Sequence, residues 1–388
     1  MDIVSLDNTY VANTYARFPV HIVSGKGAHF TDVNGRDYID LTSGIGVNSF
    51  GVADDTLTAA VTKQMGLFQH TSNLYYTAPC ATLAEKLCKA TGMKKVFFSN
   101  SGAEANETAI KAARKYAADK RGIQNPVIIT LENSFHGRTH TTLAATGQAA
   151  FHEHFLPLTD GFVHIIPDIN VLRAAIAKYP TAAILFETVR GEGGVLPLDK
   201  AFVTDMAALA AAHDILLMVD EVQTGNGRTG TLYSYMQYGF TPDVVSTAKG
   251  LGGGLPIGAT LLGDKVADVF TVGLNGSTFG GNPVACAAAN TVIDRLDEAF
   301  LKEVRQKSAY VFETLQNAKG VENVTGLGLM IGIKTVKPAK EIVCACIDRG
   351  VLALTAKDKV RLLPPLNIPM GDLQAAIEIL KDVIAEGL

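Results

Sequence analysis

Short apolar runs separated by stretches of helical periodicity make up most of the chain between residues 55 and 285. The run 215–219 is bounded by Asp214 and Asp220, and its length suits a buried strand better than a helix. The stretch 204–213 places apolar residues at helical spacing. This alternation predicts an α/β fold with helices on both faces of a mostly parallel sheet. The predicted strands are 95–98, 127–130, 182–186, 215–219, 244–247 and 259–262.

The two ends of the chain show other patterns. Asn34-Gly35 lies between two alternating runs, which is a strong hairpin signal, and the glycine-punctuated stretch 41–48 is expected to be extended. Beyond residue 288, a long amphipathic stretch (291–318) precedes three short strand-like pieces and a helix from 372 to about 386. We therefore expect an N-terminal segment (1–47) that joins a smaller α+β domain (288–388), with a large domain (48–287) between them. The strand-like pieces are 329–333, 351–354 and 360–363.

Composition and charge narrow the function classes. Of the 388 residues, 47% are hydrophobic and 19% charged, and the net charge of −4 provides no basic footprint for nucleic acid or an anionic membrane. No apolar run approaches the ~18 residues of a spanning helix. Residues 1–5 lack the features of a targeting peptide, and five scattered cysteines are expected to be free thiols, so we expect a cytoplasmic location. His152 and His154 lack further ligands, so no metal site is expected.

Two candidate reacting groups follow neighbouring predicted strands. Asp220 ends the strand 215–219, and Lys249 follows the strand 244–247 at the start of a glycine-rich loop. Ligands of such sheets bind beyond the carboxyl ends of the strands, so an acid and an amine here could contact two sides of one bound ring. We hypothesise that the ring is pyridoxal phosphate, with Lys249 forming the Schiff base and Asp220 pairing with the pyridinium nitrogen.

A bound cofactor of this kind also needs a phosphate site and a stacking ring. Ser101 and Glu104 form a capping-box pattern at a helix start, where Gly102 lets an anion approach free backbone amides. Phe135 and Arg138 follow the strand 127–130, and they could stack on a cofactor face and bind a substrate carboxylate respectively. The structural alternatives are a plain helix cap, a core ring and a surface charge. His136 receives no catalytic role.

Three further segments carry candidate residues. Glu192 lies between glycines after the strand 182–186, and Arg361 lies in a short strand before two prolines. An acid that covers an arginine for one substrate and releases it for another would let one site accept two amino donors. The turn containing Ser277 and Thr278 precedes a helix and could supply phosphate contacts from a partner subunit. Each of these residues could instead be an ordinary solvated side chain or turn.

With these residues in place, the chain resembles the class III (ω-amino) pyridoxal-phosphate aminotransferases of fold type I over nearly its whole length, from Thr14 to Pro365. The fold this implies is a large domain with a mostly parallel seven-stranded sheet and a smaller α+β domain. The motifs that carry the resemblance are Ser101-Gly102-Ala103-Glu104-Ala105-Asn106-Glu107, Phe135-His136-Gly137-Arg138-Thr139, Asp220-Glu221-Val222-Gln223-Thr224-Gly225, Ala248-Lys249-Gly250-Leu251-Gly252-Gly253-Gly254 and Ser277-Thr278-Phe279-Gly280-Gly281-Asn282-Pro283.

The resemblance implies a role for each matching residue. Cofactor binding is expected from Gly102, Ala103, Phe135, Asp220, Val222, Gln223 and Lys249, and from Thr278 of the neighbouring subunit in a homodimer with shared active sites. Substrate binding is expected from Arg138 at the carboxylate remote from the reacting amine, from Arg361 at the α-carboxylate of glutamate with Glu192 as its gate, and from Ser277 beside the substrate. Lys249 and Asp220 are the expected catalytic residues.

The implied reaction is transamination of N2-acetyl-L-ornithine with 2-oxoglutarate, giving N-acetyl-L-glutamate 5-semialdehyde and L-glutamate, a step of arginine biosynthesis. Ornithine, 4-aminobutyrate and N-succinyldiaminopimelate are alternative amino donors. Related racemases, mutases and decarboxylases, and a non-enzymatic α/β binding protein, are more distant alternatives. The chain departs from the family pattern at Arg190, where Gln is usual, and at residues 51–55, where a His-Pro element is common.

Overall fold

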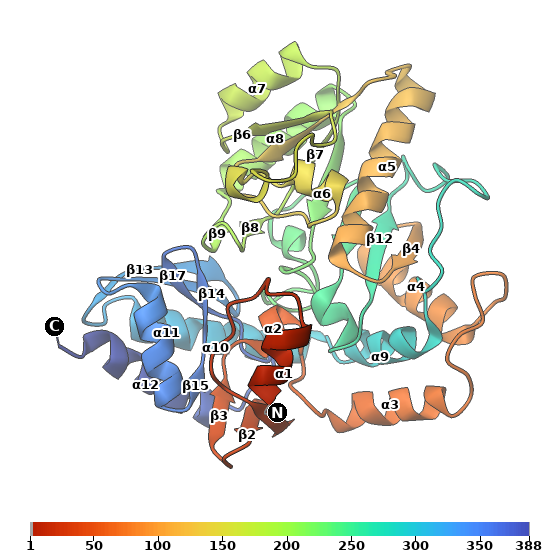
Figure 1. The fold of residues 1–388 in the computed structure, drawn as a ribbon. Helices are drawn as coiled ribbons and strands as arrows, with labels where there is room; N and C mark the ends of the chain where they lie inside the picture. Colours follow the sequence, from red (N-terminus) through yellow and green to blue (C-terminus); the bar gives the residue numbers. More distant parts are fainter. Residues whose placement is uncertain (1–2, 388) are drawn as a thin grey trace.

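The computed structural model describes residues 3–387, and its largest element is a seven-stranded sheet flanked by helices (Figure 1). The strand order is β4-β12-β11-β10-β7-β5-β6. All pairings are parallel except those of β12, which runs antiparallel to both neighbours. The predicted α/β fold with a mostly parallel seven-stranded sheet is therefore confirmed. Its strands are β4 (Lys95–Ser99), β5 (Val127–Leu131), β6 (Phe162–Ile165), β7 (Thr181–Phe186), β10 (Leu216–Asp220), β11 (Val244–Thr247) and β12 (Gly258–Leu262).

Side chains of the sheet alternate between two cores, as the two-residue period of a strand requires. On β5, Ile128 packs with α5 (Gly102–Arg121) on one face, whereas Ile129 joins the core of the opposite face. That opposite core includes residues of α4 (Ala78–Thr91), α7 (Ile169–Lys178) and α8 (Lys200–Ala212). The apolar stripe of α5 is fully or nearly fully buried: Ala105, Ala109, Ala112, Ala113 and Tyr116.

Two expectations from the sequence pattern need correction. β6 was missed because it pairs only with β5 at the sheet edge and His164 interrupts its apolar run. The stretch 41–48 is not extended: it contains α2 (Ser43–Gly46), one turn whose four residues all have positive φ. This strained turn is fixed from outside, because Asp40 accepts two bonds from the backbone N–H of Ser43 and the Ser43 hydroxyl donates to the Leu363 carbonyl at 2.6 Å.

The C-terminal third contains a second sheet of order β13-β14-β17-β16, packed with α10, α11 and α12. The N-terminal hairpin (β1, β2, β3) pairs through β3 with β15 of this region, in a sheet separate from β13-β14-β17-β16. The division at 47/48 and 287/288 stays a prediction, and its second boundary falls inside α9. The bounds are β1 (Ile22–Lys26), β2 (His29–Asp32), β3 (Asp37–Asp40), β13 (Val321–Leu327), β14 (Met330–Thr335), β15 (Val351–Leu352), β16 (Leu354–Ala356), β17 (Lys359–Leu362), α11 (Ala339–Asp348) and α12 (Met370–Ala385).

The long amphipathic stretch 291–318 is broken into two helices. The break occurs at residues 295–297, where Asp297 caps the second helix by accepting the backbone N–H of Phe300 at 2.8 Å. The first helix packs against both α4 and α3. These helices are α9 (Pro283–Asp294), α10 (Glu298–Leu315) and α3 (Asp55–Met65).

Arg228 fastens the large sheet region to the C-terminal region. Its side chain is fully buried, and one of its terminal nitrogens donates to the carbonyls of Leu329 at 3.1 Å and Pro364 at 2.6 Å. The other terminal nitrogen donates to the Ser43 hydroxyl at 3.2 Å. Burial lowers the pKa of Arg228 to about 9, and the charge of Asp40 opposes that shift. One guanidinium therefore ties together the loop after β10, the turn α2 and the end of β17.

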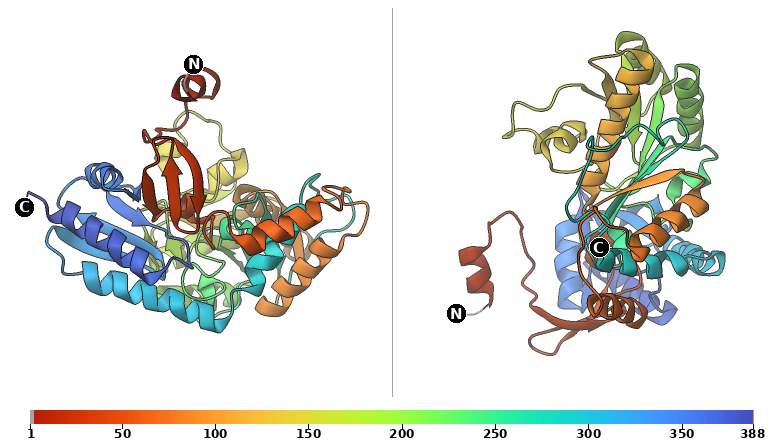
Figure 2. Two further views of the ribbon diagram at one scale, coloured as in Figure 1. Left: turned by 90° about the horizontal axis from the view of Figure 1, so that it is seen from below. Right: turned by 90° about the vertical axis from the view of Figure 1, so that its right-hand side faces the viewer.

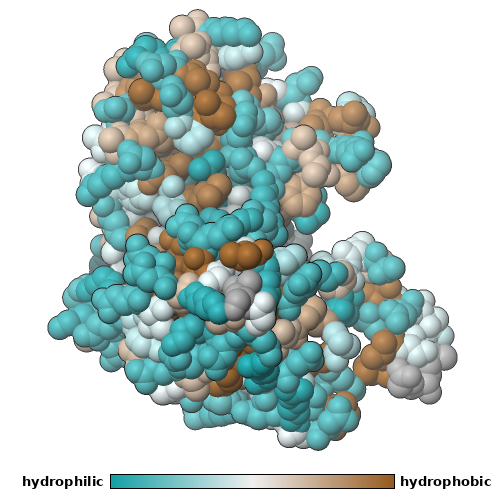
Figure 3. All heavy atoms as spheres, turned by 90° about the vertical axis from the view of Figure 1, so that its left-hand side faces the viewer, coloured by the Kyte–Doolittle hydropathy of each residue, from teal (hydrophilic) through white to brown (hydrophobic). Residues whose placement is uncertain are grey.

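The outer surface is mainly hydrophilic on one face and carries large exposed apolar side chains on two loops. The face seen in Figure 3 carries mainly hydrophilic side chains with smaller hydrophobic groups between them. Helix α1 (Ile3–Tyr10) projects from the body as an arm with no buried residue (Figure 2). Among residues 3–387, none of the helices has both the length and the apolar character that crossing a bilayer requires. Large exposed apolar side chains occur on the loops 65–76 and 271–279, namely Met65, Leu67, Leu74, Tyr75, Tyr76, Val272, Leu274 and Phe279.

Candidate active site

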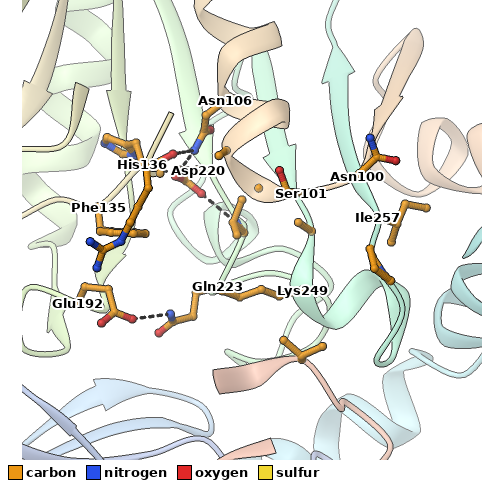
Figure 4. Close-up of a pocket in the computed structure, with 18 of the residues that line it drawn as sticks. Asn100, Ser101, Asn106, Phe135, His136, Glu192, Asp220, Gln223, Lys249 and Ile257 are labelled. Atoms are coloured by element: carbon orange, nitrogen blue, oxygen red, sulfur yellow. Dashed lines mark hydrogen bonds and ion pairs between the residues drawn. The ribbon is translucent and has the colours of Figure 1, made fainter. Parts of the chain in front are cut away.

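A cavity of about 590 Å³ lies beyond the carboxyl ends of the parallel strands (Figure 4). Parallel pairing aligns Asp220 of β10 with Ser246 of β11, so the residues that follow the two strands meet at one edge of the sheet. The cavity is lined by Tyr15, Val47, Asn100, Ser101, Gly102, Ala103, Asn106, Phe135, His136, Gly137, Arg138, Glu187, Glu192, Asp220, Val222, Gln223, Ala248, Lys249, Gly254, Leu255, Pro256 and Ile257.

Asp220 is a buried carboxylate held by three donors. Its Oδ2 atom lies 2.8 Å from Nδ1 of His136 and accepts from Nδ2 of Asn106 at 2.7 Å, while Oδ1 accepts from the backbone N–H of Val222 at 3.0 Å. Only 3% of Asp220 is exposed. Figure 4 shows Asp220, His136 and Asn106 gathered on one side of the cavity. These three bonds fix the orientation of the Asp220 carboxylate at the end of β10.

Lys249 is the first residue of a short 3-10 helix, η3 (Lys249–Gly252), and has a left-handed backbone with φ of 43°. Burial lowers the pKa of its amine, the charge of Glu192 opposes that shift, and Arg361 adds to it. A lowered pKa increases the fraction of neutral amine near neutral pH, which is the form that acts as nucleophile or base. The strained backbone and the perturbed amine occur at the residue that the sequence placed at the reaction centre.

The start of α5 offers unpaired backbone donors to the cavity. The Ser101 hydroxyl caps the helix by accepting the N–H of Glu104 at 3.2 Å. The Glu104 carboxylate accepts the backbone N–H of Asn100 at 2.8 Å and the Ser101 hydroxyl at 3.1 Å. Within residues 3–387, the amides of Gly102 and Ala103 donate to no other group. A Cβ on Gly102 would lie 2.6 Å from a methyl of Val222, so only glycine lets the helix start approach that side chain.

The two predicted carboxylate-binding arginines differ in their surroundings. Arg138 lines the cavity and contacts two aromatic rings, but within residues 3–387 it makes no hydrogen bond or ion pair. Arg361 of β17 is buried and paired with Glu192 at 2.5 Å, and its Nε has no partner in the described chain. Burial would raise the pKa of Glu192, yet Arg361 and Lys249 hold it below its ordinary value. One arginine is therefore free and the other is masked.

Glu192 also contacts Gln223, whose Nε2 donates to it at 3.3 Å, while the buried Oε1 of Gln223 has no partner among the described residues. The structure thus brings Gln223, Glu192 and Arg361 into one chain of contacts beside Lys249. Arg190, the departure from the family pattern, lies in β8 (Val189–Arg190), which pairs with β9 (Leu196–Pro197). It is buried and donates to the Glu132 carbonyl at 3.0 Å, so it does not line the cavity.

Three predicted site residues do not line this cavity. Arg361 reaches it only through Glu192, and the other two are Ser277 and Thr278. The Ser277 hydroxyl accepts from Nδ2 of Asn100 at 3.3 Å and therefore lies just outside the lining. Thr278 is exposed and lines a separate cavity of about 230 Å³ together with Phe98 and Cys80. Within one chain, neither hydroxyl reaches the space between Asp220 and Lys249.

Sequence reasoning missed three residues of the site. His136 and Asn106 hold Asp220, although His136 was given no role and Asn106 was noted only as part of a motif. Glu187, at the end of β7, lines the cavity and accepts the N–H of Phe135 at 2.9 Å. Burial raises the pKa of Glu187 to about 7, partly opposed by His136. A signal was present for Glu187, because it follows a predicted strand as Asp220 does.

Comparisons with known proteins agree with this site. The family model described as aminotransferase class-III matches residues 10–384. The chain is 51% identical over 387 residues to the acetylornithine aminotransferase of Haemophilus ducreyi, covering 99% of this chain and 98% of that one. It is 44% identical over 379 residues to the acetylornithine aminotransferase of Aquifex aeolicus, covering 97% and 100%. The chain belongs to the class III aminotransferase family, and it is a pyridoxal-phosphate-dependent aminotransferase by that membership.

Solved structures agree on the fold. The ornithine aminotransferase of Toxoplasma gondii ME49 matches with a TM-score of 0.94 at 30% identity, covering 98% of this chain and 94% of that one. A second structure of that Toxoplasma gondii enzyme, with a TM-score of 0.94, is described as having partial occupancy of PLP at its active site. The N-acetylornithine aminotransferase of Stenotrophomonas maltophilia matches with a TM-score of 0.85 at 36% identity, covering 99% and 98%. The expected fold type I architecture is thereby confirmed.

Proposed function

We propose that this chain transfers the terminal amine of N2-acetyl-L-ornithine to 2-oxoglutarate, giving N-acetyl-L-glutamate 5-semialdehyde and L-glutamate for arginine biosynthesis. The observation that carries the proposal is a pair of unlike arginines: Arg138 lines the cavity with Lys249, and Arg361 lies behind Glu192, which lines it. Arg138 has free donors, whereas Arg361 is covered by Glu192. A site of this kind suits two amino donors that share a remote carboxylate but differ beside the reacting amine. Relatives named acetylornithine aminotransferase support the choice of donor.

The residues present fit pyridoxal phosphate as the cofactor. The free amides of Gly102 and Ala103 suit its phosphate, and Asp220, as a buried anion, suits its ring nitrogen. The buried Oε1 of Gln223 has no partner among the described residues, so it can accept a hydrogen bond from a bound cofactor. Phe135 and Val222 would pack on opposite faces of the ring. When bound, the cofactor supplies an electron sink for the carbon that bears the reacting amine.

The chain's own groups then divide the work. Lys249 would hold the cofactor covalently and, once displaced, use its Nζ to take a proton from the reacting carbon and return it. His136, Asn106 and the Val222 amide hold the Asp220 carboxylate in place, where it would pair with the ring nitrogen of the cofactor.

The two arginines would select the substrates. Arg138 would bind the carboxylate remote from the reacting amine in either donor. For glutamate and 2-oxoglutarate, Glu192 would swing away so that Arg361 binds the α-carboxylate. For N2-acetyl-L-ornithine, whose reacting end carries no carboxylate, Glu192 would stay on Arg361 at the observed 2.5 Å. Without that cover, an unpaired buried guanidinium would carry a large desolvation cost.

We also propose a homodimer in which Thr278 and Ser277 complete the active site of the neighbouring subunit. The loops 65–76 and 271–279 are held together by Asn73, whose Nδ2 donates to the Ser277 and Gly280 carbonyls at 2.9 Å. Tyr76 and Val272 on these loops are fully exposed, which is unusual for large apolar side chains and typical of an interface. Thr278 lies on the same surface and does not reach the cavity of its own chain.

The choice of amino donor can be tested by single-turnover conversion of the holoenzyme with N2-acetyl-L-ornithine, L-ornithine, 4-aminobutyrate and N-succinyl-L,L-diaminopimelate in separate reactions. We expect conversion with N2-acetyl-L-ornithine to have at least ~10-fold higher kcat/KM than with L-ornithine or 4-aminobutyrate. An unacylated donor that equals or exceeds it would refute the assignment. L-Glutamate serves as the control, because every aminotransferase of this proposal must convert it.

The division of labour between the arginines predicts different substitution effects. Arg138→Ala should raise KM for both N2-acetyl-L-ornithine and 2-oxoglutarate by about 10- to 100-fold, because it removes charge-assisted bonds to each. Arg361→Ala should do so mainly for 2-oxoglutarate. Steady-state kinetics of both variants, with the surface change Arg173→Ala on α7 as control, measure the difference. Equal effects on the two substrates from Arg361→Ala would contradict the gate.

A shared site predicts complementation between subunits. Thr278→Ala should weaken cofactor affinity by roughly 10-fold, since one charge-assisted phosphate bond is lost. In a heterodimer of Thr278→Ala with Lys249→Ala subunits, one of the two sites would be intact, so cofactor affinity and activity should return at that site. Thr271→Ala, on the same loop, is the matched control. No recovery in the heterodimer would show that Thr278 serves its own chain or neither.

A further inference from the structure

Arg138 is an exposed, cavity-lining cation whose position could be fixed by an anionic or a carbonyl partner. Within residues 3–387 its guanidinium has neither. Its recorded contacts are with two rings: the guanidinium carbon lies 4.5 Å from the ring centre of Phe151 and 5.7 Å from that of Phe135. The shorter contact therefore comes from a residue that does not line the cavity.

Phe151 belongs to a short helix, and the residues before it are hydrogen-bonded to the loop that carries Phe135. It ends the 3-10 helix η1 (Ala149–Phe151), and its ring meets that of Phe135 edge-on at 5.7 Å between centres. The preceding residues are bonded to the Phe135 loop: the Gly147 N–H donates to the Ser134 hydroxyl and the Gln148 side chain donates to the Ser134 carbonyl, both at 3.0 Å.

The segment that carries Phe151 makes further hydrogen bonds to other parts of the chain. The Gly147 carbonyl accepts the backbone N–H of Asn133 at 2.7 Å. His152, next to Phe151, places its Nε2 atom 2.9 Å from the carbonyl of Leu143, in α6 (His140–Ala145). The loop that carries Phe135 and Arg138 and the segment that carries Phe151 are thus one bonded unit.

We propose that Phe151 is a positioning residue that holds the Arg138 guanidinium on its ring face and so keeps its N–H donors free for a substrate carboxylate. An aromatic face attracts a cation through its quadrupole and uses none of the five N–H donors of arginine. A carboxylate in the same place would occupy those donors and compete with the substrate, as Glu192 does on Arg361. The inference deepens the proposed function, because it rests on Arg138 as the receptor of the remote carboxylate.

The two arginines then represent two ways of holding a cation, Arg361 in a buried position and Arg138 in an exposed one. Arg361 is held by an acid that must leave before a carboxylate binds. Arg138 is held by rings that can stay in place when a carboxylate binds. Stacking uses the face of the guanidinium plane, whereas the N–H groups donate from its edge. Arg138 therefore suits the carboxylate common to both substrates, and Arg361 suits the one that only glutamate presents at the reacting end.

The test compares Phe151→Leu, which removes the ring, with Phe151→Tyr, which keeps it, in the holoenzyme. Phe151→Leu should raise KM for both N2-acetyl-L-ornithine and 2-oxoglutarate by about 3- to 10-fold with little change in kcat. Phe151→Tyr should leave both KM values unchanged, because it keeps the ring. Phe155→Leu is the matched control, because Phe155 is exposed and has no ring contact with Arg138. Unchanged KM values in Phe151→Leu would overturn the proposal.

A second arm separates this proposal from the choice of substrate. Glutarate carries two carboxylates and no amine, so its dissociation constant, followed by the visible absorbance of the holoenzyme, reports carboxylate binding without turnover. We expect Phe151→Leu to weaken glutarate binding by about 3- to 10-fold in the Arg138 enzyme and not at all in an Arg138→Ala background. An equal loss in both backgrounds would show that Phe151 does not act through Arg138. Failure to convert N2-acetyl-L-ornithine would refute the proposed function and leave this comparison valid.

Discussion

Parallel pairing of β10 with β11 fixes where the reacting groups can lie. Because the strands run in the same direction with Asp220 opposite Ser246, the chain leaves both at one edge of the sheet. Lys249 lies three residues beyond the paired Ser246, within a glycine-rich loop, and a slip of one residue in this register would turn Asp220 to the other face. The buried apolar residues of both strands resist such a slip, so the packing of the core sets the geometry of the site.

The site combines this fixed edge with parts from two other regions. Arg361 belongs to β17 of the C-terminal sheet, and Arg228 bonds the loop after β10 to the Pro364 carbonyl just beyond it. Phe135 and Arg138 come from the loop after β5, which Glu187 ties to the loop after β7 through the Phe135 N–H. The charges are likewise distributed: Asp220 has three donors, whereas burial leaves Glu187 and Glu221 with pKa values of about 7.

Much of this arrangement could be predicted from the sequence, for physical reasons that also explain the failures. Central strands are apolar on both faces, so their runs are visible, and the residues after them become site candidates. β6 lies at the sheet edge, and α2 is held in part by the Leu363 carbonyl, 320 positions along the chain, so neither has a sufficient local signal. His136 could not be given a role from the sequence, because its role depends on the contact with Asp220, 84 positions along the chain. The role proposed for Thr278 requires a second chain, which no periodicity describes.

The central claim is that Lys249, at the shared edge of β10 and β11, binds the cofactor covalently opposite Asp220. The most direct measurement is borohydride reduction of the purified holoenzyme followed by peptide mapping by mass spectrometry. The account predicts a reduced cofactor adduct on Lys249 in the native enzyme, and loss of both the adduct and the visible absorbance of the protein-bound cofactor in Lys249→Ala. An adduct on another lysine, or a retained absorbance band in Lys249→Ala, would contradict it.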